Sequence, residues 1–282
     1  MRRLLVALLL LATRASAAPC DALAASGTPC VAAHSTVRTL IASFAGALYQ
    51  LKRSFDGKTL DILAHDGVAD AEAQDAFCAG SACLIQRIYD QSGLRNHLDV
   101  APAGGAHAAP DRAANATAAA VTVGGHRAYG VYSEHGTGPG KQHSGTGYRI
   151  DNTSGVARGD EPESIFMVVD GRHFNSGCCY DYGNAELSNH DEGKGTMEAV
   201  YFGSFNASRS GWSGGSSRGP WVMADLCACR DDRSCDARAV AHAVCPPLPL
   251  HRTRAACHPS LSLARAVAAE GGVACARFAL GQ

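Results

Sequence analysis

Short apolar runs recur along the chain up to residue 226, and clusters of Gly, Pro, Asn and Asp separate them. Runs of this length that are bounded by turn residues are typical of β-strands. Three of the clearest runs span 164–170, 197–203 and 220–226. With few segments of helical spacing, the pattern predicts an all-β chain folded as a β-sandwich.

Local signals predict several elements in the first half of the chain. Turn residues predict β-hairpins, Asp-Gly at 56–57 for one and Gly124-Gly125 for the other. His97 follows a predicted turn and is interpreted as a hydrogen-bonded structural residue. The predicted elements are hairpins over 47–63 and 120–132, helices over 35–44 and 70–77, and a strand over 84–93.

The N-terminus has the pattern of a secretory leader. Arg2 and Arg3 precede the apolar stretch 4–12, which is followed by the small residues Ala15-Ser16-Ala17. We therefore interpret residues 1–17 as a signal peptide. The apolar stretch is shorter than the roughly 20 residues that span a bilayer, so we expect a secreted, extracellular protein with no membrane partner.

Composition agrees with secretion and argues against one class of partner. The net charge is −1 and no Lys/Arg cluster stands out, so nucleic acid is not expected as a partner. Of the 12 cysteines, those before residue 180 stand in three close pairs, and a disulfide is expected at the first pair. The three N-glycosylation sequons begin at Asn115, Asn152 and Asn206.

The segment 178–226 is the candidate ligand site. It opens with adjacent cysteines, Cys178 and Cys179, whose Cα atoms lie about 3.8 Å apart, closer than in ordinary disulfides. A bond between them would be a rigid apolar plate for a sugar face, and two buried free thiols are the alternative. Carboxylates and aromatic rings, typical of carbohydrate sites, follow at Asp181, Glu186, Glu198 and Asp225 and at Tyr180, Tyr182, Trp212 and Trp221.

Several long motifs together resemble one enzyme family. In order they are Cys20 to Cys30 followed by VAAHST, YQLKR, QDAFC, IYDQSG with NHL, CCYDYGNAE, MEAVYFG and GPWVMADL. This series resembles the catalytic domain of the α-L-arabinofuranosidase B family, glycoside hydrolase family 54, from about residue 20 to residue 226.

The resemblance implies a fold, an activity and a site. The fold is a concanavalin-like, jelly-roll β-sandwich, and the activity is retaining hydrolysis of terminal arabinofuranosyl residues of arabinan and arabinoxylan, without a cofactor. Arabinose-containing polysaccharide is the implied partner. The implied disulfides join Cys20 to Cys30, Cys78 to Cys83 and Cys178 to Cys179. Cys178, Cys179 and Trp212 are implied to line the arabinose pocket, and Asp225 to bind sugar hydroxyls.

After Leu226 the chain departs from the family pattern. Cys227 stands where the resemblance implies the nucleophilic glutamate, and the aspartate that acts as acid and base has no counterpart. We therefore expect 18–226 to be the N-terminal part of a catalytic domain, a truncated sandwich with no intact catalytic residue.

The tail, residues 227–282, has a different composition. It holds fourteen Ala, seven Arg and six Cys but no Lys, Asn, Ile, Tyr, Trp or Met. We interpret it as disordered or as an out-of-frame or intron reading, with a real domain as the alternative. Its cysteines and histidines match no regular metal-ligand spacing, so no metal is expected.

Three functions remain open from the sequence. The first is a secreted arabinofuranosidase by descent, with little or no activity. The second is a catalytically dead module that still binds arabinose. The third is a non-functional, truncated gene product.

Overall fold

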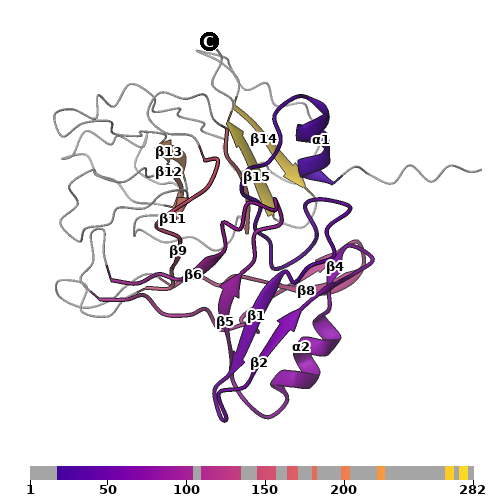
Figure 1. The fold of residues 1–282 in the computed structure, drawn as a ribbon, viewed down its shortest axis with the longest axis vertical. Coiled ribbons are helices and arrows are strands. Elements are labelled where there is room, and N and C mark those ends of the chain that lie inside the picture. The colour runs from indigo at the N-terminus through magenta and orange to yellow at the C-terminus, as the bar shows by residue number, and fades with distance from the viewer. Residues whose placement is uncertain are drawn as a thin grey trace, which may run out of the picture.

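The computed structural model describes residues 18–103, 109–134, 145–156 and 164–170 with their side chains, and the backbone of five further strands between residues 180 and 278. Strands dominate these residues, with two short helices (Figure 1). Neither helix is long and apolar enough to cross a membrane.

The elements follow one another in two groups, the first described with side chains and the second as backbone. The first group is α1 (Pro19–Ala25), β1 (Tyr49–Arg53), β2 (Thr59–Ile62), β3 (Ala64–His65), β4 (Val68–Ala69), α2 (Ala71–Cys78), β5 (Cys83–Ile88), β6 (Leu98–Val100), β7 (Ala119–Val123), β8 (His126–Gly130), β9 (Tyr148–Arg149) and β10 (Phe166–Asp170). The second group is β11 (Tyr180–Tyr182), β12 (Glu198–Gly203), β13 (Trp221–Asp225), β14 (Ala264–Ala269) and β15 (Val273–Phe278).

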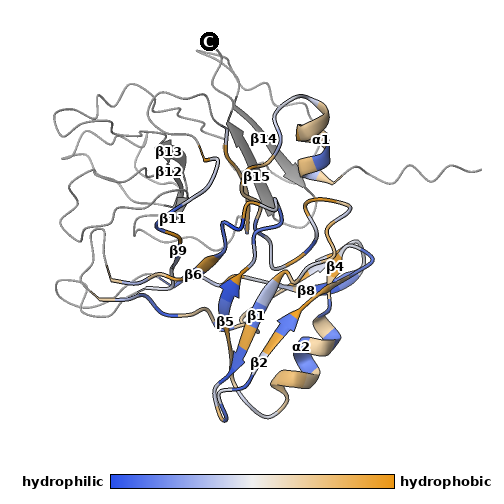
Figure 2. Cartoon of the chain, viewed as in Figure 1, coloured by the Kyte–Doolittle hydropathy of each residue, from blue (hydrophilic) through white to orange (hydrophobic). Residues whose placement is uncertain are grey.

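The largest sheet has the strand order β2-β1-β5-β6-β9, and all its pairs are antiparallel. Hydrophobic and hydrophilic residues alternate along β1 and β2, as the colours in Figure 2 show. This alternation places one side of the strands in the core. The predicted hairpin over 47–63 is confirmed, with its first strand starting at Tyr49 and with Leu51 paired to Leu60.

The core lies between this sheet and α2. The side chains of Leu48, Tyr49, Leu51 and Ile85 are fully buried, at 0% exposure. Each such aliphatic side chain contributes about 1.5–3 kcal/mol when it leaves water. Gln74 of α2 is also fully buried, because its amide accepts a hydrogen bond from the Tyr49 hydroxyl at 2.6 Å and donates one to the Ala116 carbonyl.

The predicted helix over 70–77 is confirmed as α2. The Asp70 carboxylate caps it by accepting a hydrogen bond from the Ala73 amide at 2.9 Å. A disulfide between Cys78 and Cys83 then joins the end of α2 to the start of β5. This disulfide is the one that the resemblance implied.

The helix predicted for residues 35–44 is wrong. The backbone there is irregular, because its polar groups bond to distant segments instead of to the next helical turn. The Thr39 amide donates to the Gly67 carbonyl, and the Leu40 amide donates to the Gln91 side chain at 2.7 Å. The apolar residues at helical spacing are used by tertiary contacts, which override the local pattern.

The segment enclosed by the first disulfide is a helix followed by a turn. The Cys20–Cys30 disulfide is present, and α1 begins at Pro19, whose fixed φ suits the first helical position. The Cys20 amide donates to the Leu40 carbonyl, and Cys20 packs with Ala33 and Leu40 in a second small cluster. The N-terminal segment is therefore tied to the body of the fold.

Smaller sheets complete the described chain. β7 and β8 form the predicted hairpin around Gly124-Gly125, and β3 pairs with β4. β12 lies between β11 and β13, and β15 lies between β10 and β14. Strands β14 and β15 belong to the tail, so part of the tail pairs with β10. The origin of the tail, as a real segment or as an out-of-frame reading, stays a prediction.

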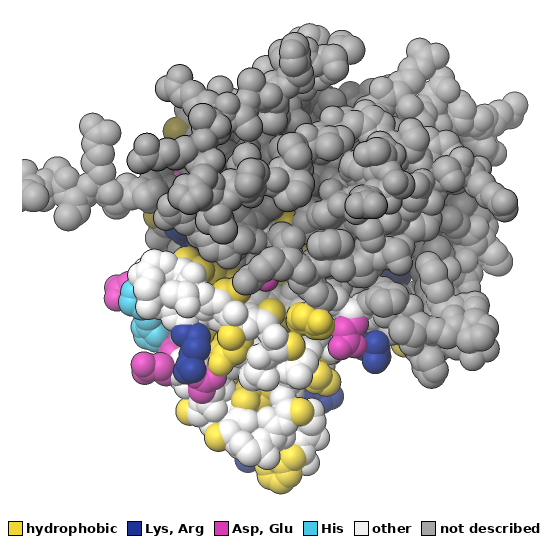
Figure 3. All heavy atoms as spheres, turned by 180° about the vertical axis from the view of Figure 1, so that it is seen from behind, with side chains coloured by type: hydrophobic (Ala, Val, Ile, Leu, Met, Phe, Trp, Pro, Cys, Tyr) yellow, Lys and Arg dark blue, Asp and Glu magenta, His cyan; other side chains and the backbone are white. Residues whose placement is uncertain are grey.

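Charged side chains of both signs are interspersed on the described surface seen in Figure 3. Some described charged side chains form ion pairs, such as Arg53 with Asp56 at 2.7 Å and Arg112 with Glu134 at 3.2 Å. Exposed pairs of this kind contribute little to stability.

Candidate functional site

The three-stranded sheet β11-β12-β13 carries the segment that the sequence singled out. Its register aligns Asp181 of β11, Ala199 of β12 and Asp225 of β13 in one row. Neighbouring strands lie about 4.8 Å apart, so the backbones of the two aspartates are separated by about 10 Å. Two residues that are 44 positions apart in the sequence are thus brought to one place.

Glu198 occupies a different position in this sheet. It pairs with Tyr182, one row beyond the row of the two aspartates. Successive positions of a strand belong to opposite faces of a sheet, so position 198 belongs to the face opposite position 225. Of the carboxylates predicted from sequence, the register therefore places Asp181 and Asp225 on one face and separates Glu198 from them.

The remaining predicted site residues lie outside the described residues. The bond between the adjacent cysteines, the pocket-lining role of the tryptophan and the position of the expected nucleophile therefore stay predictions. So does the sequon at Asn206. The site residues concerned are Cys178, Cys179, Glu186, Trp212 and Cys227.

A buried aspartate organises a second cluster, formed by the IYDQSG and NHL motifs. The Asp90 carboxylate accepts hydrogen bonds from the amides of Ala33, Ser92 and Asn96 and from the Ser92 hydroxyl, at 2.6–3.0 Å. Burial alone would raise the pKa of Asp90, but these hydrogen bonds outweigh it and the pKa is lowered. Asp90 is thus an ionised anchor whose oxygens are already occupied.

The side chain of Asn96 extends this cluster. It donates to the carbonyls of Val31 and Ser154 and accepts from the Ser154 amide, all at 2.8–2.9 Å. Asn96 is only 1% exposed. Asp90 and Asn96 therefore join three distant loops and hold the fold together.

Two histidines border the same cluster. The interpretation of His97 as a hydrogen-bonded structural residue is confirmed, because its Nδ1 accepts the Asp90 amide hydrogen at 3.0 Å. The Nε2 atom of His34 lies 2.5 Å from the Asn96 carbonyl oxygen. Burial lowers the pKa of both imidazoles, and the Arg87 cation lowers that of His97 further.

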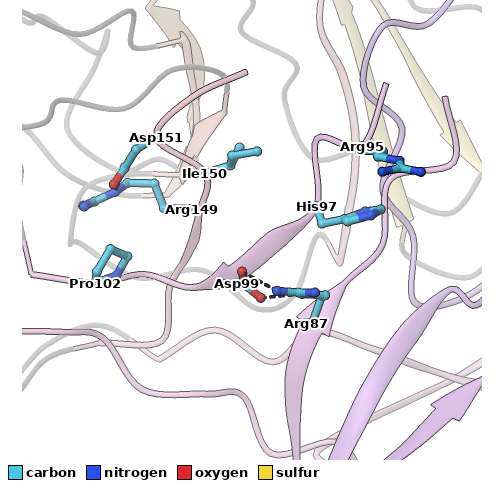
Figure 4. Close-up of a pocket in the computed structure, with 8 residues that line it drawn as sticks. All are labelled: Arg87, Arg95, His97, Asp99, Pro102, Arg149, Ile150 and Asp151. Atoms are coloured by element: carbon cyan, nitrogen blue, oxygen red, sulfur yellow. Dashed lines mark hydrogen bonds and ion pairs between the residues drawn. The ribbon is translucent and has the colours of Figure 1, made fainter. Parts of the chain in front are cut away.

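A pocket with a volume of about 360 Å³ opens beside this cluster, where β5, β6 and β9 meet (Figure 4). Sequence reasoning missed it. Its arginines are scattered through the chain, and the strand register that assembles them cannot be read from any local motif. The lining residues are Arg87, Arg95, His97, Asp99, Pro102, Arg149, Ile150 and Asp151.

Metal binding finds no support in the described part of the chain. No group of three or more His, Cys, Asp or Glu side chains converges there. Of the cysteines and histidines of the tail, only Cys275 in β15 is described, and only as backbone.

Comparison with protein families gives one match over most of the chain. Residues 19–229 match the catalytic domain of α-L-arabinofuranosidase B. A probable α-L-arabinofuranosidase B of Aspergillus flavus is 51% identical over 221 residues, which are 76% of this chain and 41% of that protein. An α-L-arabinofuranosidase of Hypocrea jecorina is 50% identical over 216 residues.

Solved structures agree with the sequence match. An arabinofuranosidase in complex with arabinofuranosyl-α-1,2-xylobiose superposes with a TM-score of 0.64 at 49% identity, over 74% of this chain and 42% of that one. A family 54 α-L-arabinofuranosidase soaked with a cyclic sulfate inhibitor gives the same TM-score at 48% identity. The predicted all-β sandwich class is confirmed by these neighbours, and the chain spans about two fifths of the length of the relatives that it matches.

Proposed function

The chain belongs to the family of α-L-arabinofuranosidase B catalytic domains, and from this premise we propose that it binds terminal arabinofuranosyl residues of arabinan and arabinoxylan but hydrolyses them weakly or not at all. The match over 19–229 carries the proposal, because it includes the sheet in which Asp181 and Asp225 share a row. A relative that holds arabinofuranosyl-α-1,2-xylobiose supports an arabinose-bearing saccharide as the ligand.

The aspartates of this row are suited to bind a sugar. A carboxylate accepts hydrogen bonds from hydroxyl groups, and charge-assisted bonds of this kind are stronger than neutral ones. Asp225 takes this role in the proposal, with Cys178 and Cys179 as the apolar plate under the ring and Trp212 beside it. Binding therefore needs no group beyond residue 225.

Hydrolysis needs two further groups. In the retaining reaction, a carboxylate attacks the anomeric carbon, the glycosidic bond breaks, and an acid gives its proton to the departing oxygen. Water, deprotonated by the same residue, then displaces the carboxylate. Cys227 stands at the proposed nucleophile position, and no residue of the sequence corresponds to the aspartate that the resemblance implies as acid and base. We therefore expect the chemical step to fail while binding persists.

A gain-of-function variant tests this proposal. The purified chain should release almost no nitrophenol from 4-nitrophenyl α-L-arabinofuranoside. The Cys227→Glu variant should release a burst of about one equivalent of nitrophenol, because nitrophenolate leaves without help from an acid. Turnover should then be slow, because hydrolysis of the glycosyl-enzyme still lacks its base. Cys229→Glu, two residues further on, is the matched control and should give no burst.

Two results would contradict the proposal. Steady nitrophenol release by the unaltered chain that Cys227→Ala abolishes would show that the thiol is a working nucleophile. A burst from Cys229→Glu equal to that from Cys227→Glu would show that the nucleophile position is misassigned.

This proposal covers two candidates, a weakly active hydrolase and a catalytically dead module that still binds arabinose, and the cysteine at position 227 favours the second. Calorimetry with arabino-oligosaccharides tests it, and the absence of binding heat would exclude it. If both candidates fail, the remaining explanation is a non-functional, truncated gene product. In that case, cDNA sequenced across codon 226 should contain an in-frame Glu codon after it.

We also propose that the protein is secreted and glycosylated. The support is the leader pattern of residues 1–17, the two disulfides, and the exposed positions of Asn115 and Asn152. Treatment of the secreted chain with an N-glycosidase should lower its mass, and an unchanged mass would rule out glycans at these sequons.

A further inference from the structure

The pocket between β5, β6 and β9 has the make-up of a binding site, although no part of the proposed function uses it. Its volume of about 360 Å³ falls in the range of about 300–1,000 Å³ found for small-molecule sites. Figure 4 shows Arg87, Arg95 and His97 along one side and Arg149 with Asp151 on the other.

Two of its guanidinium groups are held in place by carboxylates. Nε and a terminal nitrogen of Arg87 donate to the two oxygens of Asp99 at 2.6 and 2.8 Å. Nε of Arg149 donates to Asp151 at 2.6 Å, and the Arg149 side chain is only 12% exposed. Such groups lose little conformational freedom when a ligand binds, because their partners already fix them.

Arg95 differs from these two arginines. It makes no hydrogen bond or ion pair with another described residue, and it is exposed at the pocket. Its φ of 63° lies in the left-handed region, which is rare for a residue with a long side chain. Strained positions of this kind concentrate at ligand sites, so an arginine here suggests a role outside the fold itself.

His97 supplies a second polar group. Its Nδ1 accepts the Asp90 amide hydrogen, so the ring proton of the neutral imidazole is on Nε2. A T-shaped contact with Tyr89, at 5.2 Å between ring centroids, holds the ring in this position. The Nε2–H group is thereby fixed as a hydrogen-bond donor.

The charges indicate which ligand fits. Three arginines and two aspartates line the pocket, so its net charge is one positive, carried by Arg95, which has no ion-pair partner among the described residues. A guanidinium binds a carboxylate with two parallel hydrogen bonds, and a single carboxylate balances a single excess charge better than a doubly charged phosphate does. Pro102 and Ile150 add an apolar surface for the carbon-bound hydrogens of a sugar ring.

We propose that this pocket is a second saccharide subsite, which binds a carboxylate-bearing sugar through Arg95 and the Nε2–H of His97. The choice of a saccharide rests on the proposed function, whereas the choice of an acidic one rests on the pocket alone. The subsite would hold the polysaccharide through uronic acid residues, separately from the arabinofuranosyl residue at the β11-β12-β13 sheet.

Calorimetric titration with trigalacturonate tests the proposal, on full-length protein from which N-glycans have been removed, since Asn152 lies next to Asp151. The acid should bind, and its methyl ester, which is the same sugar without the charge, should not. Arg95→Asn is the key variant, because Asn adopts a positive φ more readily than Arg does. It should keep or raise the melting temperature and weaken trigalacturonate binding about tenfold or more, as the loss of a charge-assisted bond predicts.

Arg112→Gln is the matched control, because Arg112 lies outside the pocket and pairs with Glu134. It should leave trigalacturonate binding unchanged. Equal binding of the acid and its ester, no binding of either, or unchanged binding to Arg95→Asn would each overturn the proposal. The ligands of the arabinofuranosyl site are neutral sugars, so these results are independent of the nitrophenol assay.

Discussion

Asp90 shows how a single residue joins distant parts of the chain. Its four hydrogen-bond donors come from the N-terminal loop at Ala33 and from its own loop at Ser92 and Asn96. A motif such as IYDQSG invites a catalytic interpretation of its aspartate. The structure gives Asp90 a structural role, because both oxygens of its carboxylate already accept hydrogen bonds.

Asp90→Asn should destabilise the protein by about 2–4 kcal/mol at pH 7, because an amide nitrogen then faces a backbone donor and the charge-assisted bonds are lost. The lowered pKa of Asp90 means that its contribution is present above the unfolded pKa of about 3.9 and is lost as the pH falls through the folded value. Urea unfolding at pH 7 and at successively lower pH measures both effects, and the difference between variant and parent should shrink below about pH 4.

Asp61→Asn is the control at this scale, because Asp61 is exposed and, among the described residues, its side chain accepts only from the Gln50 and Tyr89 side chains. Its effect should stay within about 0.5 kcal/mol. A loss for Asp90→Asn as small as that for Asp61→Asn would contradict the anchoring role.

At the scale of elements, local chemistry predicted some segments and failed at others. The hairpins over 47–63 and 120–132 were predictable because turn residues and alternation act within a few positions. The irregular conformation of segment 35–44 was not predictable, because its hydrogen-bond partners Gly67 and Gln91 lie far along the chain. A helical spacing of apolar residues cannot predict hydrogen bonds to residues that come close only in the folded chain.

The turn of the β7–β8 hairpin gives a prediction that isolates backbone strain. Gly124 and Gly125 have φ of 57° and 85°, and a Cβ atom at either would meet no atom within 4 Å. Gly124→Val should therefore cost about 1–2 kcal/mol through its backbone conformation alone. Gly124→Asn should cost much less, since Asn-Gly is a preferred pair for such turns. Thermal or urea unfolding compares the two variants, and equal costs would refute this explanation.

At the scale of the whole molecule, the sequence indicated a candidate ligand segment but not its geometry. Asp181 and Asp225 were candidates from composition alone, and only the register of β12 shows that they share a row while Glu198 does not. The arginine pocket could not be predicted, because Arg87, Arg95 and Arg149 meet through the order of β5, β6 and β9. Residue type predicts chemistry, but topology decides which residues act together.

The last prediction concerns how the tail meets the rest of the fold. β15 pairs with β10 over Phe166–Asp170, and Phe166 also packs against the cluster of Cys20, Ala33 and Leu40. In the full chain, amides of 166–170 that bond to β15 should exchange slowly with solvent, and deletion of residues 259–282 should speed their exchange. Hydrogen exchange read by mass spectrometry measures this, with the β7–β8 hairpin as the internal control. Equal exchange of these amides in both chains would show that the tail does not pair with β10. That result would favour the interpretation of the tail as an out-of-frame reading that adds nothing to the sandwich.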